Sequence, residues 1–286
     1  MAEKAACEQL ENERTRELND VAQSISYGDV HAGVDICVNR ISTVDEELVE
    51  QYNAISGPLL DISRQLQKSL LQQLKDKQRG GKQTGLMMGR RLDAHALCRN
   101  DGKVFYKNAL PNEIPQMSVG LLLDESGSCT YARSSAIILY DFCKALHIPV
   151  TVYGHSTSGS SVELYSYAEF ESIDNDDKYR LMDIAARGSN RDGAALRFVA
   201  EQLVKILILV SDGQPAAPGY YGSAAEEDLR GIKQEYRRKG VLFIAAAIGE
   251  DKQNIERIYG DSFMDITDLN QLPVKLTAAV KRHMRV

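Results

Sequence analysis

The chain has 286 residues, of which 43% are hydrophobic and 26% are charged, and its formal net charge is −6. This length and composition suit a globular, water-soluble chain with one large core or two smaller ones. Because the charge balance is mildly acidic, the bulk electrostatics do not favour nucleic acid or an anionic membrane surface as a partner. We therefore expect neither kind of partner.

The sequence contains no obvious targeting or membrane-spanning segment. Its longest apolar runs, around Leu121 and at 205–210, fall far below the roughly 20 residues that span a bilayer. The first residues are charged and lack the apolar core of a secretory signal, which predicts a cytoplasmic location. The five cysteines include no C-x-x-C pair, which favours reduced structural thiols over a disulfide framework or a zinc site.

The first hundred or so residues have helical periodicity, with expected breaks at Gly28 and at 39–42. Residues 43–46, Thr-Val-Asp-Glu, have the form of a capping box and predict a helix that starts near Val44. A Gly-Pro pair at 57–58 is expected to end this helix and to start another.

From Leu59 onward, leucine and isoleucine recur at three- and four-residue spacing, which predicts one apolar stripe on a long helix. Packing of this stripe within the molecule is the simpler interpretation, and binding of a partner is the alternative. Residues 75–85 are polar, basic and glycine-rich, which predicts a flexible linker or exposed loop. Residues 92–110 are expected to form a hairpin or a turn that leads into an edge strand.

After Met117, strand-like runs alternate with helix-like segments, which predicts an α/β domain with a mostly parallel sheet. The expected strands are 118–123, 149–154, 162–168, 206–211, 241–248 and 262–266. The expected helices are roughly 131–147, 175–186, 193–204, 223–239, 252–259 and 271–284. A short polar turn precedes 162–168, which predicts that this strand pairs antiparallel with its predecessor at a sheet edge. We therefore expect a mainly helical region at 1–115 and an α/β domain at 116–286.

Three polar clusters follow expected strands or precede expected helices. They are 124–128 (Asp-Glu-Ser-Gly-Ser), 189–193 (Ser-Asn-Arg-Asp-Gly) and 211–213 (Ser-Asp-Gly). In an open parallel sheet, ligands bind outside the carboxyl ends of the strands, where the connections diverge. We therefore expect the three clusters to form one site.

The site offers hydroxyl and carboxylate oxygens, which suit Mg²⁺ or another divalent cation such as Mn²⁺ or Ca²⁺. The candidate ligands are Asp124, Ser126, Ser128, Asp192 and Asp212, with Asn190 as the alternative to Asp192. The structural alternative is that the two strand-end aspartates merely cap helices. Their joint occurrence with two serines in register favours a metal site.

The D-x-S-x-S pattern at 124–128, the middle polar loop and the later Ser-Asp-Gly resemble the metal-ion-dependent adhesion site of a von Willebrand factor A (VWA) domain. More narrowly, the chain resembles bacterial proteins related to the cobalt chelatase CobT subunit and the nitric-oxide-reductase activation protein NorD. The resemblance lies in residues 124–128, in Asn-Arg-Asp-Gly-Ala-Ala-Leu-Arg and in the upstream Gly-Arg-Arg-Leu-Asp and Val-Phe-Tyr. This resemblance covers roughly 75–286. It implies a Rossmann-like VWA fold with a six-stranded sheet. It also implies a module that works with a hexameric MoxR-type AAA+ ATPase in metal insertion or client activation.

We expect a non-catalytic protein-binding subunit in which an Asp or Glu of the partner completes the shell of a bound Mg²⁺. Because the sequence has no nucleotide-binding loop, a separate MoxR-type AAA+ chain would supply ATP hydrolysis. The alternatives are a self-contained Mg²⁺-dependent hydrolase and a cation-gated adhesion domain unrelated to ATPases. No G-x-S-x-G elbow is present, and His155 is expected to be a packed or surface residue.

Overall fold

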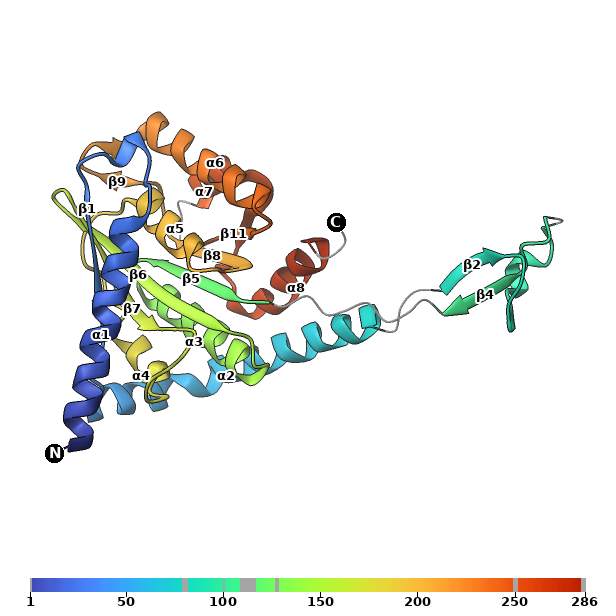
Figure 1. The fold of residues 1–286 in the computed structure, drawn as a ribbon, viewed down its shortest axis with the longest axis horizontal. Helices are drawn as coiled ribbons and strands as arrows, with labels where there is room; N and C mark the ends of the chain where they lie inside the picture. Colours follow the sequence, from blue (N-terminus) through green and yellow to red (C-terminus); the bar gives the residue numbers. More distant parts are fainter. Residues whose placement is uncertain are drawn as a thin grey trace. The chain divides into compact units, whose positions relative to one another are not determined.

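A computed structural model describes residues 2–78, 82–99, 101–108, 117–126, 129–248 and 252–283 (Figure 1). The chain divides into two compact units. The main unit comprises Met1–Leu66 and Met117–Val286, and the second unit comprises Gln67–Gln116. The expected division after residue 115 therefore does not match the structure, because the N-terminal segment belongs with the α/β domain.

The helices of the α/β domain lie close to where the hydrophobic periodicity predicted them. The α-helices are α1 (Ala2–Ser24), α2 (Glu46–Gln78), α3 (Cys129–Ala145), α4 (Asp177–Arg180), α5 (Asp192–Glu201), α6 (Gly222–Arg238), α7 (Lys252–Tyr259) and α8 (Leu272–His283). Short 3-10 turns are η1 (Asp29–His31), η2 (Ala94–Ala96), η3 (Leu181–Asp183), η4 (Gly260–Ser262) and η5 (Leu269–Gln271). None of the described helices is both long enough and apolar enough to cross a membrane.

The main unit is built on a seven-stranded sheet with the order β1-β7-β6-β5-β8-β11-β12. Its strands are β1 (Asp35–Arg40), β5 (Val119–Asp124), β6 (Val150–Ser158), β7 (Ser161–Ala168), β8 (Ile206–Ser211), β11 (Leu242–Ala247) and β12 (Phe263–Asp265). The five strands from β6 to β12 in this order run parallel. One buried core joins α1, α5, α6 and α7 to one face of the sheet, while α3 contacts β5 and β6 (Figure 1). The predicted α/β class with a mostly parallel sheet is confirmed.

The sheet differs from the prediction at one edge. We expected six strands with 162–168 as the antiparallel edge strand. In the structure β7 is antiparallel to β6, as expected, but it is an inner strand because β1 pairs with it in parallel. Only Ile36 and Val38 are buried in β1, so the apolar pattern of this strand is too weak to predict it.

Helix α2 runs through the Gly57-Pro58 pair that was expected to end it. Proline removes one backbone donor and disfavours a helix interior, at a cost of roughly 3 kcal/mol. The helix continues because its apolar stripe is buried along the next turns. The buried members of the stripe are Ile62, Leu66 and Leu70.

The start of α2 also differs from the predicted capping box. Asp45 Oδ1 accepts a hydrogen bond from the Leu48 backbone N–H at 2.9 Å. Asp45 therefore caps the helix in place of Thr43, and the helix begins at Glu46 rather than at Val44.

The second unit contains a small antiparallel sheet with the order β2-β4-β3. Its strands are β2 (Lys82–Leu86), β3 (Arg91–Leu92) and β4 (Phe105–Asn108). The hairpin expected within 92–110 is part of this sheet. The linker expected at 75–85 is partly wrong, because α2 extends to Gln78 and β2 begins at Lys82. β2 has a single apolar side chain, so its sequence alone carries no strand signal.

A four-residue connection joins α5 to β8 in the centre of the sheet. The helix predicted over 193–204 ends at Glu201, which leaves 202–205 for the connection. Leu203 adopts a left-handed conformation with φ 59°, which reverses the chain within this short span. Ser118 Oγ donates to the Leu203 carbonyl at 3.0 Å and accepts from the Lys205 N–H at 3.0 Å. These contacts fix the position of α5, whose first turn reaches the site described next.

Candidate metal centre

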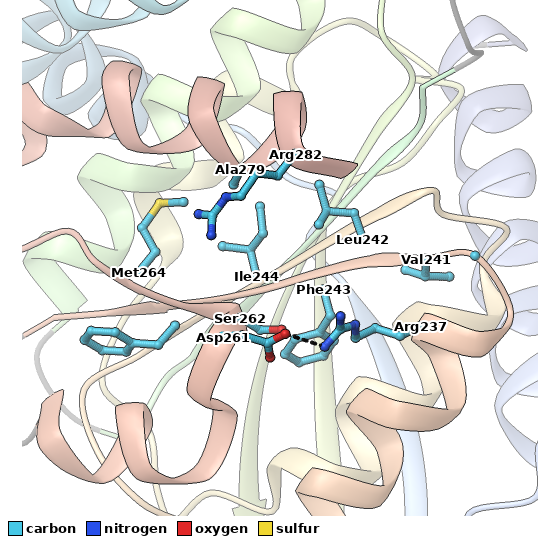
Figure 2. Close-up of a pocket in the computed structure, with 12 residues that line it drawn as sticks. Arg237, Val241, Leu242, Phe243, Ile244, Asp261, Ser262, Met264, Ala279 and Arg282 are labelled. Atoms are coloured by element: carbon cyan, nitrogen blue, oxygen red, sulfur yellow. Dashed lines mark hydrogen bonds and ion pairs between the residues drawn. The ribbon is translucent and has the colours of Figure 1, made fainter. Parts of the chain in front are cut away.

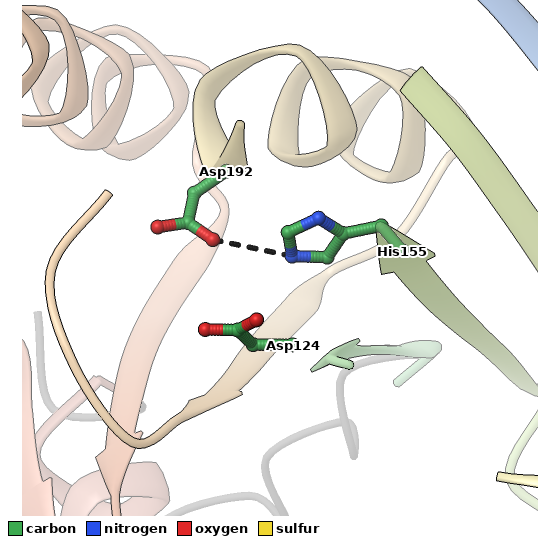
Figure 3. Close-up of side chains that lie close together, drawn as sticks. All are labelled: Asp124, His155 and Asp192. Atoms are coloured by element: carbon green, nitrogen blue, oxygen red, sulfur yellow. Dashed lines mark ion pairs between the residues drawn. The ribbon is translucent and has the colours of Figure 1, made fainter. Parts of the chain in front are cut away.

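Three ionisable side chains meet at the carboxyl ends of the central strands (Figure 3). Asp124 is the last residue of β5, His155 lies beside it in register on β6, and Asp192 is the first residue of α5. One potential ligand atom from each lies within 4.8 Å of the others. The three residues are only 5%, 0% and 2% exposed. We call this group the strand-end cluster.

The Asp124 carboxylate is held by three hydrogen-bond donors. Its Oδ1 accepts from the Ser126 backbone N–H at 2.9 Å. Its Oδ2 accepts from Asn190 Nδ2 at 2.9 Å and from Ser211 Oγ at 2.8 Å. These three hydrogen bonds fix the orientation of the carboxylate.

Asn190 and Asp192 were left as alternatives for the middle ligand. The Asn190 amide donates to Asp124, and its Oδ1 accepts from the Ala216 N–H at 2.8 Å. The amide oxygen is thus directed at the backbone, whereas the Asp192 carboxylate faces His155 (Figure 3). The structure therefore places Asp192 in the cluster and gives Asn190 the part of a donor that orients Asp124.

His155 and Asp192 form a buried ion pair, with His155 Nε2 3.2 Å from Asp192 Oδ1 (Figure 3). Among the described residues, the other ring nitrogen of His155, Nδ1, has no hydrogen-bond partner. Asp124 brings a second buried carboxylate within 4.8 Å of this pair. Two carboxylates and an imidazole are a donor set that fits a divalent cation.

Burial and neighbouring charges shift the pKa values of both His155 and Asp192. Burial disfavours the charged imidazole, but Asp192, Asp124 and Glu125 outweigh it, so the pKa of His155 is raised. Burial raises the pKa of Asp192, and the charges of Asp124 and Asp212 add to that effect while His155 opposes it. Both shifts favour the protonated forms of His155 and Asp192, so a cation bound at this site would compete with protons.

The other predicted ligands are not members of the strand-end cluster, and one of them lies outside the described residues. Asp212 follows β8 and is half-buried, and its charge reaches Asp192. Ser126 is half-buried and contributes its backbone N–H to Asp124. Ser128 lies outside the described residues.

His155 is not among the residues predicted for this site, and Ser211, which belongs to the predicted 211–213 cluster, donates a hydrogen bond to Asp124. His155 is packed, as expected, but its ring faces two carboxylates. The signal that would have identified it is register: His155 lies directly opposite Asp124 in the adjacent parallel strand. Because register is a relation between two strands, neither segment reveals it alone.

Beneath the Asp124 turn, Glu125 is fully buried and paired. It accepts hydrogen bonds from Tyr167 Oη at 2.6 Å and from Arg187 Nε at 2.7 Å. Burial raises the pKa of Glu125, although Tyr167 and Arg187 favour its ionised form. A Cβ at Gly154 would lie 1.9 Å from Glu125 Oε1, so only glycine fits at that strand position. Glu125 therefore supports the turn rather than offering a ligand.

A second buried network holds the start of α5. Asp228 Oδ2 accepts from Tyr220 Oη at 2.8 Å and lies 2.9 Å from His31 Nε2, while Arg197 lies 3.3 Å from Oδ1. A Cβ at Gly193 would lie 2.3 Å from Asp228 Oδ2. The N-terminal segment, through His31, thus helps to position the residue next to Asp192.

A separate pocket of about 520 Å³ lies between β11, β12 and α8 (Figure 2). Its lining includes Arg282 and the ion pair of Arg237 and Asp261, whose Nη1 and Oδ2 are 2.7 Å apart. The pocket shares no residue with the strand-end cluster, so it is not part of the candidate metal centre.

No protein-family model matches the sequence. The chain is 24% identical over 204 residues to the "Uncharacterized protein YojO" of Bacillus subtilis (strain 168), a match that covers 63% of this chain and 32% of that protein. The matched region thus spans about a third of the length of that relative. The crystal structure of manganese-loaded Plasmodium vivax TRAP protein is similar with a TM-score of 0.39 and 17% identity, over 57% of this chain and 73% of that one.

Proposed function

We propose that the strand-end cluster holds a divalent cation and that the chain is a VWA-type docking module. The observation that carries this proposal is that three buried side chains, Asp124, His155 and Asp192, each bring a potential ligand atom within 4.8 Å of the others. Two carboxylates this close in a buried site repel each other, which disfavours both being ionised at once. A cation satisfies carboxylate oxygens and offsets their mutual repulsion.

We propose Mg²⁺ as the ion, with Asp124 and Asp192 as its anchors and Ser126, Ser128 and Asp212 as further oxygen ligands. In this proposal His155 orients Asp192, and Asn190 and Ser211 orient Asp124. Residues that position ligands in this way typically change metal affinity by roughly 10- to 100-fold. The bound ion would supply an electrophilic position at which the Asp or Glu of a partner replaces a water.

The partner in this proposal is a MoxR-type AAA+ ATPase together with the client that it remodels, in a cytoplasmic setting. The support for it is the sequence resemblance to CobT- and NorD-type proteins, which places the metal motif and the upstream Gly-Arg-Arg-Leu-Asp segment in one chain. In that arrangement this chain recognises the client, and the ATPase hydrolyses ATP to drive the remodelling.

The test of the metal site is calorimetric titration of the full chain with Mg²⁺, Mn²⁺ and Ca²⁺. We expect one bound ion, no binding by Asp124→Ala, and binding weakened by roughly 10- to 100-fold in His155→Ala for Mg²⁺ and Mn²⁺ alike. Glu227→Ala, which removes an exposed carboxylate on α6, is the matched control and should bind as the wild type does. A wild-type chain that binds no divalent cation at millimolar concentration would refute the proposal.

The docking function needs a separate test with the purified ATPase partner. We expect capture of the partner by the wild-type chain in Mg²⁺, loss of capture when the ion is chelated, and loss in Asp124→Ala. Cation-dependent binding of a client without the ATPase would favour the adhesion alternative. Mg²⁺-dependent turnover by the isolated chain, abolished in Asp124→Ala, would favour the hydrolase alternative.

A further inference from the structure

The small sheet of the second unit has almost no core of its own. Across 84–99 and 101–107, Ala96 is the only buried side chain. Large apolar side chains are exposed instead: Met87 by 68%, Met88 by 85%, Leu92 by 56% and Leu97 by 58%. A three-stranded sheet gains stability by covering an apolar face, and exposed apolar groups of this kind are typical of an interaction site.

The same segment is basic. Residues 84–107 carry five Arg or Lys side chains and two Asp, whereas the whole chain has a net charge of −6. Met87 and Met88 immediately precede Gly89 and the exposed Arg90. Methionine adapts to irregular apolar surfaces, so a Met pair followed by arginine suits a partner that has an apolar floor and an acidic rim.

The main unit has a groove with those properties, formed by the start of α2 and the segment around α4. It has a volume of about 400 Å³, and the half-buried Val44, Val49 and Tyr179 contribute its apolar surface. Four acidic residues also line it, among them the exposed Glu46 and Glu50. We call it the acidic groove.

Among the described residues, Lys178 lies next to the acidic groove. Lys178 Nζ is 4.6 Å from the centre of the Tyr179 ring. With four carboxylates in the lining, the groove still has an excess of negative charge.

We propose that the segment 87–91 of one copy of this chain docks in the acidic groove of a second copy. Both halves of the interface, a basic apolar segment and an acidic apolar groove, are present in this chain. The contact is heterologous, so one contact between two copies leaves one groove and one segment unused, and assembly either closes on itself or extends to further copies. The inference is independent of the proposed metal site, because none of its residues belongs to the strand-end cluster.

The test is sedimentation of the full chain at concentrations up to about 300 µM, a range in which interfaces of micromolar affinity are populated. We expect concentration-dependent association in the wild type. Arg90→Glu and Glu50→Arg should each weaken it by at least about tenfold, because each places like charges together. Arg16→Glu and Glu47→Arg change exposed charges on α1 and α2 outside the groove lining, and should associate as the wild type does.

Mixing the two interface variants gives the sharpest outcome. In the mixture, the segment that carries Arg90→Glu meets the groove that carries Glu50→Arg, and the unchanged segment meets the unchanged groove. Opposite charges then face each other at both contacts, so the mixture should associate although neither variant does alone. The double variant Arg90→Glu/Glu50→Arg should associate by itself for the same reason. This rescue also shows that each variant is folded.

A wild-type chain that is monomeric over this range overturns the proposal, whether its basic segment binds RNA, lipid vesicles or neither. Association that persists in both single variants, or that the mixture does not restore, also overturns it. Association lost in Met88→Ser as well as in the charge variants supports it, because the apolar contact and the charge contact then act together.

Discussion

At the scale of single residues, the candidate metal centre depends on how negative charge is placed around Asp124. Asn190 and Ser211 donate to one of its oxygens, at 2.9 and 2.8 Å. Asp192 brings a second buried carboxylate to the site. A carboxylate in that place should hold a cation tightly while leaving it less electrophilic toward an acidic partner.

We therefore predict that Asp192→Thr weakens Mg²⁺ binding by at least roughly 10- to 100-fold, because losing an anchoring carboxylate should cost no less than losing a residue that only positions a ligand. At saturating Mg²⁺ the same variant should bind the acidic partner more tightly, because the ion keeps more of its positive charge. Calorimetry measures the first effect and partner titration the second. Glu227→Thr is the control, and weaker partner binding at saturating Mg²⁺ would contradict the prediction.

At the scale of elements, the first turn of α5 determines where Asp192 lies. Gly193 permits the close approach of this turn to Asp228, Tyr220 and His31, which come from α6, β10 (Tyr220–Tyr221, paired with β9, Ala216–Ala217) and η1. The network thus joins the N-terminal segment, the loop after β8 and the helix that carries Asp192.

Gly193→Ala tests this packing. Its Cβ would lie within 2.4 Å of Tyr220 Oη as well as 2.3 Å of Asp228 Oδ2, so we expect a loss of about 1–3 kcal/mol in unfolding free energy and weaker metal binding. Gly231→Ala in α6 has no atom within 4 Å of the new Cβ and should instead stabilise the chain by about 0.5–1 kcal/mol. Equal effects of the two substitutions in urea unfolding would count against a close approach at Gly193.

The Asp228 network should make stability depend on pH. Burial alone would raise the pKa of Asp228, but His31, Tyr220 and Arg197 outweigh burial and lower it. An acid with a lowered folded-state pKa stabilises the fold above its unfolded value, near about pH 4, and this contribution is lost as the pH falls through the folded value.

We predict that Asp228→Asn costs about 3 kcal/mol at pH 7, because it leaves buried donors without their charged partner. The difference from the wild type should shrink as the pH falls below about 4, where Asp228 of the unfolded wild-type chain takes up a proton, and further as the pH falls through the lowered folded-state value. Urea unfolding of both proteins at about pH 7 and about pH 3.5 measures it. A difference that is the same at both pH values would exclude the charge as its source.

At the scale of the whole molecule, the N-terminal segment is part of the α/β unit. Helix α1 buries Leu18 and Ala22 in the main core, and β1 covers the edge of β7. Exposed strand edges and apolar core surface both promote aggregation. The boundary that the sequence favours, at 115–116, therefore cuts through a single folded unit.

We predict that the fragment 116–286 is much less stable than the full chain and tends to aggregate, since it lacks α1, β1 and His31. Light scattering and thermal unfolding of the two proteins measure the difference. A fragment that remains monomeric and unfolds at the temperature of the full chain would show that the N-terminal elements add nothing to this unit.

The sequence by itself determined the main strands and helices after Met117 and the positions of the polar turns between them. Long apolar runs such as 118–123 predicted the central strands, and 3.6-residue periodicity predicted α6, because both signals come from residues that are neighbours in the chain. The D-x-S-x-S pattern likewise located Asp124 at the end of β5 from local sequence alone.

Only the tertiary structure decided which segments lie side by side. It added β1 as a seventh strand, carried α2 through Pro58, placed His155 opposite Asp124 and directed the Asn190 oxygen away from the cluster. Each of these depends on contacts between residues far apart in the chain, whose free energy of packing and hydrogen bonding outweighs local preference. A single sequence does not show directly which distant residues are in contact. The hydrogen-bond partners of Asp124 could therefore be identified only from the folded structure.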